Sequence, residues 1–126
     1  MTETILIFNA PPKPVLLKIQ KALLPLRVRI RTISCEYYNQ PIGSLAGMQN
    51  ISSELKVTAE GELAAPFFVF CFLSDQKLDQ VLAALRRCGA GPFPYKAILT
   101  PTNCEWTAYE CFEEIRKEHE KMHGGA

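Results

Sequence analysis

The stretch Phe67-Phe68-Val69-Phe70-Cys71-Phe72-Leu73 decides the fold class of this chain. It is wholly apolar, which is typical of a strand that is buried on both faces of a sheet. Ser74 or Asp75 follows as a helix N-cap, and leucine and valine residues then recur at helical spacing up to Leu85. Gly89 ends that helix, and the less apolar stretch at 95–99 predicts a further strand. Residues 67–99 therefore predict a β-α-β unit.

The N-terminal part of the chain repeats this pattern. Residues 5–8 form a short, wholly apolar run, and the segment from Pro14 to Leu23 has an apolar stripe at helical spacing. Residues 27–33 then alternate between arginine and less polar side chains, which indicates an edge or half-exposed strand. In both units the first strand is the more apolar one, so we expect the two first strands at the centre of the sheet.

Two β-α-β units favour an α+β, ferredoxin-like fold: a duplicated β-α-β with a long central loop at about 34–65 and an extra C-terminal helix at about 104–122. The alternative is an α/β, three-layer, doubly wound parallel sheet, in which the long loop supplies a crossover helix. In a ferredoxin-like sheet, which is open on one face, one of the two apolar rows of residues 67–73 needs a cover. The final helix, the long loop or a second subunit supplies it.

Composition bounds the kind of protein. The chain has 126 residues, 48% of them apolar and 21% charged, with a net charge of +1. These values predict a single domain over residues 1–126, with a disordered tail at 123–126. A net charge near zero argues against a protein built to coat nucleic acid or an anionic membrane, so we expect no membrane and no nucleic-acid partner. No apolar stretch approaches the ~20 residues that a membrane helix needs.

The cysteines and histidines argue against an extracellular or catalytic protein. Five cysteines, an odd number without a Cys-x-x-Cys pair, predict reduced thiols and a cytoplasmic location. The only histidines are His119 and His123, both near the C-terminus, so a catalytic triad is poorly supported. We predict no metal and no cofactor. A thiol-dependent enzyme centred on Cys104 or Cys35 is one alternative, because a helix start lowers a thiol pKa.

A single-stranded RNA-binding domain is the other alternative. Aromatic side chains of the 67–73 run would stack on bases, and arginines of the 27–33 strand would contact phosphates. The residues concerned are Phe68, Phe70, Phe72, Arg27, Arg29 and Arg31. Packing in the core is the preferred interpretation of these phenylalanines, because phenylalanine is among the most buried residue types.

Two polar loops form the candidate ligand site. Each follows an expected edge strand and combines amides, an aromatic residue and a proline. Amides and backbone donors at a helix start can hold an anion or a carboxylate. The candidate residues are Asn39, Gln40, Pro41, Gly43, Thr100, Pro101, Asn103 and Trp106. The same residue types also build turns and caps, and Thr102 with Glu105 and Thr107 with Glu110 have capping-box spacing. The two loops meet in a parallel sheet and lie at opposite ends of a ferredoxin-like one.

These loops also carry a family resemblance. Tyr38-Asn39-Gln40-Pro41-Ile42-Gly43, the stretch 96–103 and Trp106-Thr107 resemble a bacterial domain-of-unknown-function family, number 3783. The similarity extends to the segment 70–78 and the glutamate-rich 118–120, and so over nearly the whole chain. Because the family has no established activity, the resemblance implies no mechanism. Departures from its pattern include Cys104 and three prolines before the first helix.

The sequence as a whole predicts an uncharacterised, non-enzymatic module that binds a small ligand or another protein. The ligand would be a small anion or a partner peptide held by the two polar loops. A homodimer, formed through the sheet face or the final helix, is a further option.

Overall fold

The computed structural model describes residues 2–52 and 54–123. Of the tail predicted at 123–126, His123 ends the last helix, and residues 124–126 lie outside the described part of the chain. No helix in the described part is long and apolar enough to cross a membrane.

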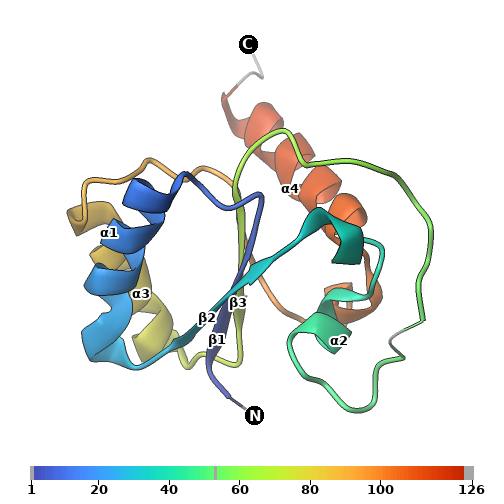
Figure 1. Ribbon diagram of the computed structural model, residues 1–126, viewed down its shortest axis with the longest axis horizontal. Coiled ribbons are helices and arrows are strands. Elements are labelled where there is room, and N and C mark those ends of the chain that lie inside the picture. Colours follow the sequence, from blue (N-terminus) through green and yellow to red (C-terminus); the bar gives the residue numbers. More distant parts are fainter. Residues whose placement is uncertain (1, 53, 124–126) are drawn as a thin grey trace.

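A four-stranded sheet in the order β2-β1-β3-β4 lies at the centre of the molecule (Figure 1). β1 (Thr4–Phe8) and β3 (Phe67–Cys71) are the inner strands and pair antiparallel, with Leu6 opposite Val69. β2 (Arg29–Ile33) pairs in parallel with β1, and β4 (Lys96–Ile98) pairs in parallel with β3. The apolar first strands are thus central and the other two are edges, as the burial pattern predicts.

Helices cover both faces of the sheet. α1 (Lys13–Leu23) and α3 (Asp75–Arg87) pack on one face, while α2 (Ile42–Leu45) and α4 (Ala108–His123) cover the other (Figure 1). The apolar runs alternate between these two cores: Ile5, Ile7, Phe68 and Phe70 face α1 and α3, and Leu6, Phe8, Phe67 and Val69 face α2 and α4. The final helix and the long loop of the same chain therefore cover the second face.

The fold is α+β with a mixed, open sheet, and the ferredoxin-like arrangement is not confirmed. In that arrangement the strands of the two β-α-β units interleave. Here each unit keeps its own parallel pair, and the units join through the antiparallel contact of β1 with β3. The same antiparallel contact rules out the alternative, an all-parallel doubly wound sheet. The long loop between β2 and β3 runs on the α2 side of the sheet (Figure 1).

Several element ends differ from the predicted ones for local reasons. Phe72 has a left-handed backbone (φ 65°), which ends β3 at Cys71. The final helix begins at Ala108 because Thr107 and Glu110 form the predicted capping box: the Thr107 N–H donates to Oε1 at 2.9 Å and the Glu110 N–H donates to Oγ1 at 3.2 Å. The box predicted for Thr102 is wrong, since that residue makes no capping side-chain bond.

Candidate functional site

The two polar loops meet, although the edge strands that precede them run in opposite directions. The Ile42 N–H donates to the Trp106 carbonyl at 2.9 Å, and the Ala108 N–H donates to the Tyr38 carbonyl at 3.1 Å. Both loops leave the sheet edges and cross the same face, where α2 contacts the 3₁₀ turn Asn103–Glu105. The expectation that oppositely directed edge strands keep these loops apart is therefore wrong.

Asn39 is bound to the chain itself. Its Oδ1 accepts the Thr58 N–H at 2.9 Å, and its Nδ2 donates to the Ala59 carbonyl at 2.8 Å. Its own carbonyl accepts the Lys56 N–H at 2.9 Å. Asn39 thereby fixes the segment that passes beside it, where no strand forms.

Asn103 closes the turn after β4. Its Oδ1 accepts the Thr100 N–H at 2.8 Å, and its Nδ2 donates to the Ile98 carbonyl at 2.9 Å. The Thr100 hydroxyl accepts the Asn103 N–H at 3.0 Å. Pro101 lies exposed in the same turn. This is the pattern in which asparagine stabilises a turn through its own backbone neighbours.

The remaining candidates form the contact between the loops. Gly43 lies so close to the second loop that a Cβ there would be 2.9 Å from the Cys104 carbonyl oxygen. Pro41 is buried at the start of α2, and Trp106 packs against the core on that side. The Gln40 N–H donates to the Tyr37 carbonyl. These residues build a structural joint, and the ligand-binding role expected of them stays a prediction.

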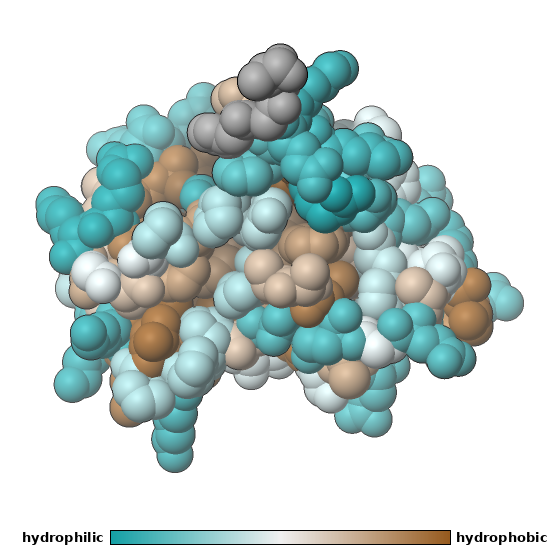
Figure 2. Space-filling view, turned by 90° about the horizontal axis from the view of Figure 1, so that it is seen from above, coloured by the Kyte–Doolittle hydropathy of each residue, from teal (hydrophilic) through white to brown (hydrophobic). Residues whose placement is uncertain are grey.

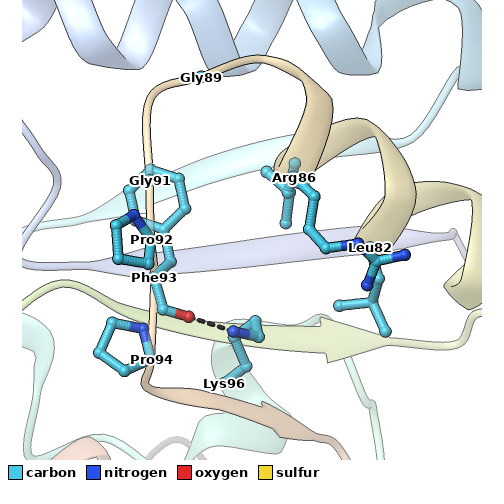
Figure 3. A pocket seen from close by; sticks show the side chains of 9 residues that line it. Leu82, Arg86, Gly89, Gly91, Pro92, Phe93, Pro94 and Lys96 are labelled. Carbon is cyan, nitrogen blue, oxygen red and sulfur yellow. Dashed lines mark hydrogen bonds between the residues drawn. The ribbon is translucent and has the colours of Figure 1, made fainter.

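A pocket that the sequence did not reveal lies between α3 and β4 (Figure 3). Its volume is about 430 Å³. Figure 3 shows Arg86 and Leu82 of α3 on one side, the segment Pro92-Phe93-Pro94 on the other, and Lys96 between them. Leu85, Gly89 and Gly91 complete the lining. Apolar side chains thus make the walls, and two cations lie at the opening.

Arg86 and Lys96 leave this pocket with uncompensated positive charge. None of the ion pairs among the described residues involves either side chain. Lys96 donates a hydrogen bond to the Phe93 carbonyl. Burial and the nearby Arg86 lower the pKa of Lys96 from its ordinary value. A bound anion would relieve this repulsion.

The pocket continues along β4 into a second cavity of about 400 Å³. The two cavities share Leu82 and Lys96. Leu78, Ile98 and Ile115 add apolar surface to the second cavity, and Thr100 and Asn103 lie at its far end. Two of the eight predicted site residues therefore border the same groove. Seen from above, the molecule shows apolar surface between polar side chains (Figure 2).

Three of the residues on which the alternative functions rest, Phe68, Phe70 and Cys104, are buried. Phe68 and Phe70 are buried beneath α1 and α3, which confirms the preferred interpretation that they pack in the core and makes them inaccessible to RNA bases. Cys104 is 4% exposed and its thiol donates to the Pro101 carbonyl at 3.3 Å.

Within residues 2–52 and 54–123, no three His, Cys, Asp or Glu side chains are grouped to hold a metal ion.

Thiol labelling tests the part of the enzyme alternative that rests on Cys104. Cys35 is exposed, whereas burial raises the pKa of Cys71 and of Cys111 to about 12. Since a disulfide reagent must reach the thiol, at about pH 8 it should label the exposed Cys35 first and leave the buried Cys71, Cys104 and Cys111 unmodified until the protein unfolds. Peptide mapping of labelled native and unfolded protein measures this order. Labelling of Cys104 ahead of Cys35 in native protein would contradict it.

Fold and pocket together define a small α+β protein with a cationic groove beside an edge strand. Residues 66–122 match the family described as Domain of unknown function (DUF3783), so the resemblance to that family is confirmed for this part of the chain. The match spans β3, α3 and β4 and most of α4, and includes both walls of the pocket. It does not reach the 38–43 loop, where the sequence also suggested a likeness. Neither a curated protein nor a solved structure matches the chain.

Proposed function

We propose that this protein is a non-enzymatic binding module that takes a carboxylate with an apolar body into the pocket between α3 and β4. The observation that supports this function is that two cations, Arg86 and Lys96, lie at the opening of an apolar cavity and take part in none of the ion pairs among the described residues. Ligand sites are typically apolar clefts with a few polar groups that fix orientation. Arginine and lysine bind carboxylates through short, charge-assisted hydrogen bonds.

The shape of the pocket restricts the ligand. Leu82, Leu85 and Phe93 offer contact to a branched aliphatic or aromatic group, and the ring of Phe93 is held by Phe68 at a centroid distance of 4.9 Å. A small carboxylate without such a group would gain only the charged contacts. N-acetyl-leucine is therefore a suitable probe, and N-acetyl-leucinamide is its uncharged counterpart.

Replacing Arg86 by alanine should weaken the binding of N-acetyl-leucine about 10- to 100-fold, because a hydrogen bond to a charged group contributes about 1.5–3 kcal/mol. Arg87→Ala is the matched control, since this neighbour on α3 is exposed and does not line the pocket. Isothermal titration calorimetry measures both variants. Equal loss in the two variants would show only a general charge effect, and equal binding of the acid and the amide would rule out carboxylate recognition.

Lys96 should make this binding depend on pH. Its pKa is lowered in the free protein, and a bound carboxylate raises it again by stabilising the ammonium form. Affinity should therefore stay constant below the pKa of free Lys96 and fall as the pH rises above it, because binding then takes up a proton. Titrations from about pH 7 to about pH 10 measure the trend. Lys96→Met should bind more weakly and lose the pH dependence; an unchanged alkaline decline in this variant would contradict the assignment.

A further inference from the structure

β4 is the last strand of the sheet, so one side of its backbone has no neighbouring strand. The Phe68 N–H donates to the Tyr95 carbonyl, and the Leu99 N–H donates to the Phe70 carbonyl, so alternate residues of this segment face β3. The intervening residues, Lys96 and Ile98, direct their N–H and C=O groups away from the sheet. An unprotected edge of this kind is a template for another extended chain.

The groove follows this edge over its whole length. The first cavity lies at the segment 91–96, before and at the start of β4, and the second lies at 96–100, along and after it. Leu78 and Leu82 form one wall and Ile115 belongs to the other, so apolar surface lies on both sides of the edge. Ile98, at 53% exposure, is one of the large apolar side chains that remain uncovered.

We propose that the ligand is the C-terminal end of an extended peptide, which adds a strand antiparallel to β4 and places its terminal carboxylate between Arg86 and Lys96. The inference rests on the proposed function and names the ligand class. The direction follows from charge: the two cations lie at the N-terminal end of β4, so the peptide must end there. Edge-strand addition combines main-chain hydrogen bonds with pockets for alternate side chains.

Asn103 sets the length of this pairing. Its Nδ2 already donates to the outward Ile98 carbonyl, so one acceptor at the far end of the edge is occupied. Regular pairing is thus confined to the N–H and C=O groups of Lys96 and the N–H group of Ile98, which corresponds to the last three or four residues of the peptide. Leucine or valine at the peptide end suits the apolar walls.

Two comparisons by calorimetry on the full chain test the proposal. Acetyl-Thr-Val-Thr-Val-Leu with a free carboxylate should bind at least tenfold more tightly than N-acetyl-leucine, and its C-terminal amide should lose most of that affinity. N-methylation of the peptide, one backbone nitrogen at a time, should abolish binding at every second position and be tolerated at the positions between, because only alternate N–H groups reach β4.

Variants of Ile98 test whether the peptide binds to the backbone of β4. Ile98→Pro and Ile98→Ala both remove the side chain, but only proline removes the outward N–H, and edge strands tolerate proline at such positions. The proline variant should bind the peptide more weakly than the alanine variant, while both bind N-acetyl-leucine equally. A peptide no tighter than N-acetyl-leucine, or N-methyl effects without alternation, would overturn strand addition and leave the proposed function standing. Absence of binding by both probes would overturn both.

Discussion

Replacing Phe67 by alanine should destabilise the protein by about 3–5 kcal/mol, the cost of truncating a fully buried phenylalanine. Phe67 is 0% exposed, and its ring lies 5.8 Å from that of Phe8 and 5.6 Å from that of Phe112. It joins the central strands to the final helix, so a cavity there weakens the packing of α4 on the sheet. Urea unfolding, followed by circular dichroism, measures the loss.

Leu17→Ala is the control for this variant. Leu17 is a large apolar side chain on α1, but it is exposed, so its truncation should change the free energy of unfolding by no more than about 0.5 kcal/mol. A loss below about 1 kcal/mol for Phe67→Ala would mean that α4 does not pack over this ring, and the covered sheet face would need another explanation.

Tyr38→Ala should be about as damaging, at roughly 3–5 kcal/mol, because Tyr38 is a fully buried aromatic residue in the joint between the two polar loops. Its ring contacts Phe8 and Tyr109 edge to face, at centroid distances of 5.5 and 5.6 Å. Its hydroxyl accepts the Asn9 N–H at 2.6 Å and donates to Glu62. Thermal and urea unfolding measure the loss.

Tyr38→Phe distinguishes the contribution of the hydroxyl to stability from that of the ring. It keeps the aromatic contacts and leaves the Asn9 N–H without its partner, which should cost about 1–3 kcal/mol. If the phenylalanine variant were as unstable as the alanine variant, the ring contacts would contribute nothing. If it were as stable as the unchanged protein, the hydroxyl would not hold Asn9 in place.

Local patterns predicted the elements of this fold but not their connections. The apolar runs at 5–8 and 67–73 predicted buried central strands, and the arginine alternation at 27–33 predicted an edge strand. The partner of β2 could not be predicted in the same way. Whether β2 pairs with β1 or with β3 is a long-range choice between strands, and such a choice has no periodic signal in the sequence.

The two candidate sites show a similar limit. Asn39 and Asn103 drew attention because amides suit both ligands and turns, and in the structure both side chains hold turns and loops of the chain itself. Arg86 lies in the last turn of α3, where cations are common, and Lys96 lies in β4, so neither position by itself indicates a site. They line one pocket because the 89–94 segment, which connects α3 to β4, passes beside the end of α3.

The most direct test of the proposed pocket is a ¹⁵N–¹H NMR titration of the protein with N-acetyl-leucine. Binding in the pocket should give saturable shift changes confined to the amides of Arg86, Phe93, Lys96 and their neighbours, with small changes around Asn39 and Tyr38. Changes centred on the joint of the two polar loops, or no saturable changes at all, would contradict it.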